Sequence, residues 1–163
     1  MEYPDLFVFP EGHPPSPYNN PVSLFNSGKW ASLLLPRDLR LIAVGWLERP
    51  GFATGPVPND CIEALAAAHA IRIISDGSRG IHVCTLCGEA TPQMQWRDQS
   101  IQLMGHGHYL VRAEKSVYMA PELLLHYIGK HDYCPPQEFV RATIHGEFLE
   151  QDDLETVWEN DSD

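Results

Sequence analysis

Two cysteines three positions apart place the strongest constraint on how this chain can fold. Cys84 and Cys87 lie in the segment HVCTLCGEA, and Gly88 follows the second cysteine directly. A tight turn that brings two thiolates together supplies half of a tetrahedral zinc site, and a glycine allows such a turn to close. If the motif binds a metal, the other two ligands must come from elsewhere in the chain, and the motif then dictates a long-range contact.

Two histidines on one expected helix are the best candidates for the remaining ligands. His126 and His131 stand five apart in PELLLHYIGKH, within the spacing of paired histidine ligands. The order of CxxC knuckle, β-hairpin and histidine-bearing helix matches zinc-finger construction. An ideal helix separates positions i and i+5 by about 140°, so His131 should lie at a loosened helix end. His82 is the substitute ligand, because alternate residues of a strand share a face with Cys84, and Cys134 is a further alternative.

Other interpretations of these residues stay open. Cysteines are often small buried core residues. A redox CxxC normally opens a helix within a βαβ pattern, whereas here a strand leads into the motif and Gly88, Thr91 and Pro92 indicate a turn. His106 and His108 in GHGHY admit a second metal or an open catalytic position, although a turn with one histidine on each side is the simpler interpretation. We interpret the isolated histidines as structural: His13, His69 and His145.

The remaining pattern predicts a single α+β domain over residues 1–163. Asn59 or Asp60 can cap a helix through CIEALAAAHAIR, whose apolar residues recur at helical spacing. Residues 39–46, LRLIAVGW, form either a short strand or a helix, because periodicity cannot decide for so short an apolar run.

A β-rich stretch followed by two helices is expected after residue 80. Ile81–Cys84 should be a strand that leads into the knuckle, with QMQWRDQSIQLMG and HYLVRAEKS as further strands and a hairpin turn at GHG. Pro121 should lie in the first turn of the histidine-bearing helix. Pro135 and Pro136 should separate that helix from the last one, PQEFVRATIHG.

Composition divides the chain into three regions. Residues 1–38 are expected to be an irregular Pro-rich lead-in. Residues 39–146 are the zinc-binding α+β body, with the knuckle, hairpin and helix core and a flanking helix. Residues 147–163 are an acidic tail with eight acidic and no basic residues, and without them the net charge of −11 falls to −3. This balance argues against a nucleic-acid partner, which needs a Lys/Arg surface, and it suits a basic protein partner.

The chain is expected to be cytoplasmic and not to bind membranes. It contains no run of about 18 apolar residues that would predict a transmembrane helix. The amino end, MEYPDLFVFPEGHPP, lacks the basic and apolar regions of a signal peptide. In that compartment a CxxC motif serves metal binding or redox chemistry more often than a structural disulfide.

Three segments together resemble a family of small, mostly bacterial proteins with domains of unknown function. The segments are LIAVGWLERPGFATGPVP (41–58), GIHVCTLCGEA (80–90) and YMAPELLLHYIGKHDYCPPQEFVRA (118–142). The VGWL…TG, HxCxxC and APxLxxHYIxxHxYxPPxEF patterns are specific in combination, and the resemblance runs from about Leu41 to Ala142. It implies no reaction. It does imply that His82, Cys84, Cys87, His126 and His131 belong to the family's motifs, whereas Cys134 matches no cysteine position.

The sequence therefore predicts a small soluble zinc-binding protein with a structural Cys2His2-type site. We expect a protein-binding module without catalysis, similar in charge to immunity proteins that neutralise a basic partner. The alternative is a metal-dependent hydrolase with an open zinc position, for which Glu89, Glu122 or Asp132 would serve as the base. An HNH-type nuclease is disfavoured, because the His-Asn-His pattern is missing and the chain is acidic.

Overall fold

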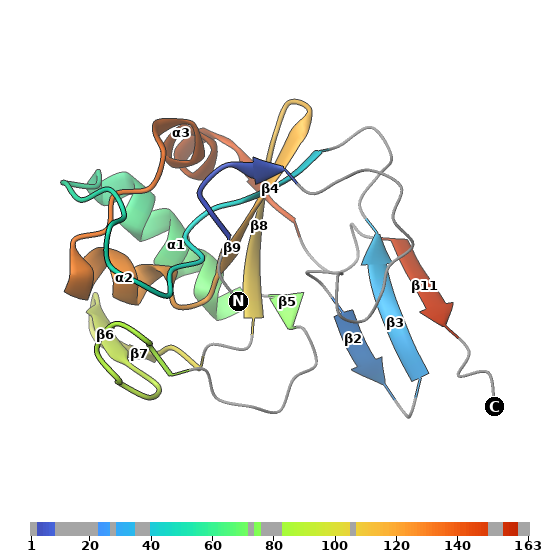
Figure 1. Cartoon of the computed structure of the whole chain (residues 1–163), viewed down its shortest axis with the longest axis horizontal. Coiled ribbons are helices and arrows are strands. Elements are labelled where there is room, and N and C mark those ends of the chain that lie inside the picture. The colour runs from blue at the N-terminus through green and yellow to red at the C-terminus, as the bar shows by residue number, and fades with distance from the viewer. Residues whose placement is uncertain are drawn as a thin grey trace.

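Three helices and a six-stranded sheet form the body of the protein, and a second, three-stranded sheet lies on the side of the large sheet away from the helices (Figure 1). The computed structural model describes residues 3–8, 23–26, 29–34, 40–71, 74–75, 83–104, 107–149 and 155–159. This mixed arrangement confirms the predicted α+β class. None of the helices in this part of the chain has the length and apolar content that crossing a bilayer requires.

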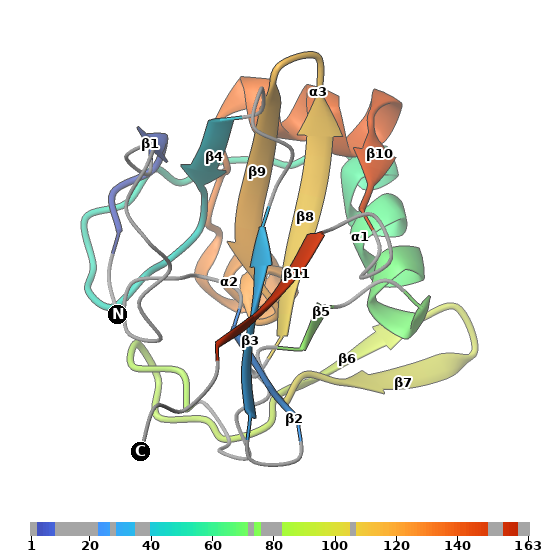
Figure 2. The same cartoon turned by 90° about the vertical axis from the view of Figure 1, so that its right-hand side faces the viewer.

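The strands of the large sheet lie in the order β1-β4-β9-β8-β10. The short strand β5 also pairs with β8. Its strands are β1 (Phe7–Val8), β4 (Arg40–Ala43), β5 (Ile74–Ser75), β8 (Gly107–Ala113), β9 (Ser116–Pro121) and β10 (Glu147–Phe148). The β4–β9 pair is parallel and the others are antiparallel. Consecutive residues of β8 and β9 are buried, as expected of strands covered on both faces. Figure 2 shows β3 and β11 in front of these two central strands, with the helices behind.

The remaining strands form two smaller sheets. One has the order β11-β3-β2, formed by β11 (Glu155–Glu159), β3 (Lys29–Leu34) and β2 (Ser23–Asn26). The other is the hairpin of β6 (Gln93–Trp96) and β7 (Gln99–Gln102).

The helices are α1 (Asn59–Ile71), α2 (Leu124–His131) and α3 (Gln137–His145). The alanine-rich sequence of α1 has high helix propensity, and Cys61, Leu65 and Ala66 on its inner face are fully buried. On α2, five residues in succession, Leu124 to Ile128, are buried. This helix therefore lies in the core, and its last turn carries Lys130 and His131 toward the surface.

The structure has two hairpins where one was expected, and α2 begins later than predicted. The turns at Arg97 and Glu114 both have positive φ, 53° and 41°. Two-residue hairpin turns need this conformation and normally take Gly or Asn there, so the sequence carried no hairpin signal at either point. Pro121 ends β9, where its missing N–H is tolerated, and does not begin α2. Residues 105 and 106 of the expected GHG turn lie outside the described residues.

Both ends of the chain contain strands that the sequence did not predict. The expected irregular lead-in, residues 1–38, holds β1, β2 and β3. The expected acidic tail holds β10, which pairs with β8, and β11, which pairs with β3. These pairings join residues far apart in the chain, which local sequence patterns cannot reveal.

A carboxylate near the amino end ties β1 to the end of α2. The Asp5 carboxylate accepts hydrogen bonds from the hydroxyl of the fully buried Tyr133, at 2.8 and 2.9 Å, and from the Gly45 amide at 2.9 Å. Burial, reinforced by Asp5, raises the pKa of Tyr133. Gly45 has φ +76°, and a Cβ there would lie 2.7 Å from the Leu124 side chain. Only glycine lets the chain follow this path beside α2.

Replacing Asp5 with alanine is expected to destabilise the fold. The Tyr133 hydroxyl and the Gly45 amide would lose their acceptor inside the protein, which costs about 1 to 3 kcal/mol for each buried group. Urea unfolding should show a loss of about 2 to 4 kcal/mol. Asp98→Ala, at the exposed β6–β7 turn, is the matched control and should change stability by less than about 0.5 kcal/mol. Equal effects of the two substitutions would contradict this role of Asp5.

Candidate metal centre

Two cysteines and two histidines from distant parts of the chain meet at one point. One ligand atom from each of Cys84, Cys87, His126 and His131 lies within 4.8 Å of the other three. Cys84 Sγ is 3.5 Å from His131 Nε2, and Cys87 Sγ is 3.5 Å from His126 Nε2. In the described part of the chain, this is the one group of three or more His, Cys, Asp or Glu side chains arranged closely enough to hold a metal ion.

The spacing and the donor types fit a tetrahedral zinc ion. Zn–S and Zn–N bonds of about 2.3 and 2.05 Å make the S–N edge of a regular tetrahedron about 3.6 Å long. The two measured S–N distances of 3.5 Å agree with that edge. Two thiolates and two imidazoles are a usual donor set for structural zinc, whereas Mg²⁺ and Ca²⁺ prefer oxygen.

A short turn closed by backbone hydrogen bonds presents the two thiols. The Gly88 amide donates to the Cys84 carbonyl at 2.7 Å, and the Cys84 amide donates to the Glu89 carbonyl at 2.9 Å. Val83 and Ala90 form a bridge on either side of this turn. Gly88 has φ +74° and its missing Cβ faces open space, so glycine is needed for its backbone conformation rather than for want of room.

The two histidines reach the site from opposite ends of α2, His126 from its first turn and His131 from its last. His131 is its last residue, and Asp132 caps it in the left-handed conformation at φ 55°. The Asp132 and Tyr133 amides both donate to the Tyr127 carbonyl, which closes the helix end. The imidazole rings of His126 and His131 lie 5.1 Å apart at 80°. The expected helix end at His131 is thus present, and the last turn needs no loosening, because the side chains bridge the i,i+5 separation.

Neighbouring loops hold both halves of the site in place. The Thr85 hydroxyl donates to the Glu48 carbonyl at 3.0 Å. The segment after α2 pairs with the loop before α1, through the Thr54–Tyr133 bridge and a bond from the Cys134 amide to the Ala53 carbonyl. The loop that follows β4 therefore contacts the knuckle and the end of α2 together.

Burial shifts the pKa of two residues of the candidate site, Cys84 and His126. Burial raises the pKa of the Cys84 thiol, against the backbone amides of Cys87 and Leu86, which lower it. Burial, with the neighbouring His131, lowers the pKa of His126, although Glu89 raises it. A neutral imidazole is ready to bind a metal, whereas Cys84 must lose a proton when a metal binds.

Solvent exposure differs sharply within the set. Cys84 is fully buried and His126 is 6% exposed, whereas His131 is half-buried and Cys87 is exposed. One edge of the site therefore faces solvent, and the opposite edge belongs to the hydrophobic core.

The other candidate ligands do not join this cluster in the described part of the chain. Cys134 is in sulfur contact with the carbonyls of Pro56 and Pro135, at 3.9 and 3.8 Å. His82 and His106 lie outside the described residues. His108 is buried in β8, with its ring 5.1 Å from that of Trp46.

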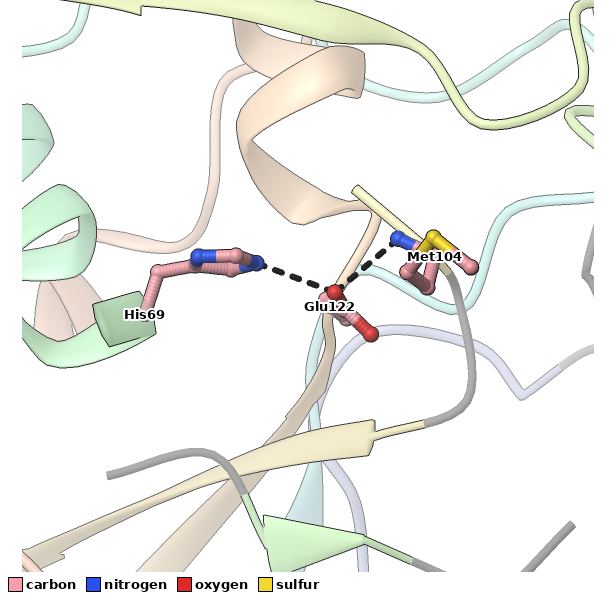
Figure 3. Close-up of polar contacts among 3 residues, drawn as sticks. All are labelled: His69, Met104 and Glu122. Carbon is pink, nitrogen blue, oxygen red and sulfur yellow. Dashed lines mark hydrogen bonds and ion pairs between the residues drawn. The ribbon is translucent and has the colours of Figure 1, made fainter. Parts of the chain in front are cut away.

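Glu122, a candidate base in the hydrolase interpretation, forms part of a separate polar contact. Its Oε1 accepts from the Met104 amide at 3.0 Å and lies 2.9 Å from His69 Nε2 (Figure 3). Both side chains are largely buried, with 5% and 15% of their surface exposed. This contact joins α1 to the β9–α2 junction. His69 was expected to be structural, but its partner could not be predicted, because nothing in the local sequence pairs the two residues.

Comparison with known proteins places the chain in a family without a described activity. Neither the curated proteins nor the solved structures contain a match to it. One family model matches residues 3–144, a range that includes the amino-terminal residues that the sequence resemblance left out. That range also contains Asp5 and β1, consistent with their place in the large sheet. The chain belongs to the family described as a domain of unknown function, DUF7919.

Proposed function

We propose that this protein binds one zinc ion at Cys84, Cys87, His126 and His131, and that the ion stabilises the fold. The observation that carries the proposal is the convergence of four suitable donor atoms within 4.8 Å. The two sulfur–nitrogen distances of 3.5 Å support zinc in particular, because they match the edge of a small tetrahedral site.

A structural role is favoured over catalysis because the donor set is complete. Catalytic zinc keeps a position for water and needs a base beside it. Four protein donors leave no such position. The Glu122 carboxylate is engaged by His69 and the Met104 amide and lies outside the four-residue group. These contacts favour a structural zinc ion, which links the knuckle to α2, rather than a metal-dependent hydrolase.

The biological role in this proposal is protein binding in the cytoplasm, with a basic protein as partner. Eight of the last 17 residues are acidic and none is basic. Such a charge distribution speeds association with a positively charged surface and disfavours nucleic-acid backbone. A zinc-stabilised body would then carry an acidic segment, as immunity-like proteins do when they neutralise a basic protein.

Protein purified without added metal should contain about one zinc per chain, because a closed Cys2His2 site binds zinc tightly. Elemental analysis gives the stoichiometry, and a cobalt-substituted sample should show the absorption of a tetrahedral sulfur-containing site. His131→Ala should lower the zinc content. If zinc persists in that variant and is lost only when His82→Ala is added, His82 is the substitute ligand. Metal-free protein with both thiols reduced and a stable fold would refute the proposal.

Cys84→Ser should destabilise the whole domain, because a structural site contributes its binding energy to folding. We expect a loss of at least about 3 kcal/mol, or about 6 to 12 °C in melting temperature for a chain of this size. Chelator should lower the melting temperature of the unmodified protein to a similar degree, and zinc should restore it. Cys134→Ser, outside the cluster, should leave zinc content and chelator response unchanged. If verified removal of zinc leaves the melting temperature unchanged, the structural role is excluded.

The proposed basic partner is tested through the acidic segment. For a partner recovered by pull-down, Asp152→Asn with Asp153→Asn should slow association and flatten its salt dependence, because two attractive charges are removed. Asp98→Asn with Glu114→Gln removes two carboxylates elsewhere and should have a smaller effect. An association rate that changes neither with salt concentration nor with the Asp152 and Asp153 substitutions would rule out electrostatic recruitment by this segment.

A further inference from the structure

The two cysteines of the metal centre differ in their access to solvent, and this difference has chemical consequences. Cys84 is 0% exposed and belongs to the hydrophobic core cluster. Cys87, three positions later on the same turn, is exposed. Reagents dissolved in water therefore meet the Cys87 residue first. Thiol oxidation follows such exposure, and redox-sensing cysteines typically have a second cysteine close by.

We propose that Cys87 is an oxidation site, that a hydroperoxide is its reagent, and that oxidation joins it to Cys84 and releases the zinc. The inference rests on the proposed zinc site and adds a means of regulating it. It assigns different roles to the two thiolates: Cys87 reacts with the peroxide, and Cys84 resolves the product.

The chemistry proceeds in two balanced steps. The Cys87 thiolate attacks the peroxide, the O–O bond breaks, and the products are a Cys87 sulfenic acid and one hydroxide or alkoxide. The Cys84 thiolate then attacks the Cys87 sulfur, an S–S bond forms, the S–O bond breaks, and hydroxide leaves. Each leaving group is protonated by the buffer, so that two protons are consumed overall. The two sulfurs together give up two electrons, which reduce the peroxide.

The geometry of the knuckle allows the second step. The two sulfurs lie within 4.8 Å of one another and must approach to about 2.05 Å in a disulfide. Both belong to one short turn, so the approach needs no movement between distant elements. The turn closes through Gly88 in the left-handed conformation.

The other two thiols are poor competitors for the same reagent. Cys61 is 0% exposed on α1, and burial raises its pKa to about 11, so little of it is the reactive thiolate. Cys134 is half-buried and lies outside the four-residue group. Its sulfur contacts the backbone carbonyls of Pro56 and Pro135.

Loss of both thiolates leaves His126 and His131 as the remaining donors from the group. Two imidazoles on one helix are half of the tetrahedral set, too few to retain zinc against a chelator. The contact between the knuckle and α2 then loses its metal link. Oxidised protein should therefore melt at the same lowered temperature as chelator-treated protein.

The test uses the full-length, zinc-loaded protein carrying Cys134→Ser, which removes the competing half-buried thiol. Hydrogen peroxide is added in the presence of a chromophoric zinc chelator, and mass spectrometry follows the thiols. We expect one zinc released per disulfide formed between Cys84 and Cys87, and recovery of zinc binding after reduction. A matched pair of variants assigns the roles. Cys87→His keeps four donors and should release zinc at least about tenfold more slowly. Cys84→His keeps Cys87, which a sulfenic-acid trap should label.

Several results would overturn the inference. They are equal release rates for Cys87→His and its parent, trapping at Cys84 before Cys87, and zinc retained after the disulfide has formed. If a histidine variant fails to bind zinc, the parent protein still decides the order, because limited peroxide with the trap shows which thiol reacts first. If zinc binds at one ion per chain and raises the melting temperature but is not released by peroxide, this inference alone is refuted. Protein without zinc refutes the proposed function as well.

Discussion

The contact between the CxxC turn and the two histidines of α2 is the constraint on which the rest of this structure depends. The turn has a small apolar content of its own, since Thr85, Cys87, Gly88 and Glu89 are exposed, and cannot be stabilised by hydrophobic burial alone. Its position is determined by Cys84 in the core and by donors on α2. The loop after β4 contacts both partners. A link at this point therefore controls three segments that are distant in sequence.

The four residues of the candidate site could be predicted from the sequence because metal chemistry limits the choice of residues. Thiols and imidazoles at short spacings suit zinc, and this inference does not depend on the path of the intervening chain. The path itself was predicted less well. Arg97 and Glu114 make hairpin turns in a backbone conformation typical of glycine, and Pro121 occupies a strand end instead of a helix start. Side-chain reach also accommodates the i,i+5 histidines, which backbone geometry alone disfavoured.

Long-range pairing explains what the sequence could not reveal about the two ends. Asp5 meets Tyr133 across 128 positions, and β11 pairs with β3 in the second sheet. Neither contact follows from periodicity or turn signals, because strand partners are selected by the whole fold. The His69–Glu122 contact was missed for the same reason. The family match from residue 3 onward agrees with an amino-terminal segment that is part of the domain.

The β3–β11 pair has a consequence for synthesis on the ribosome. In this pair Leu34 lies opposite Glu155 and Trp30 opposite Glu159. Chains emerge from the amino end and begin to fold during translation. The knuckle, β8, β9 and α2 all precede residue 155 in the chain, and β2 pairs with one edge of β3, whereas the other edge of β3 must wait for β11. An unpaired strand edge is prone to join another chain. A chain that ends before residue 155 would thus carry all four residues of the candidate site together with a strand edge still open to aggregation.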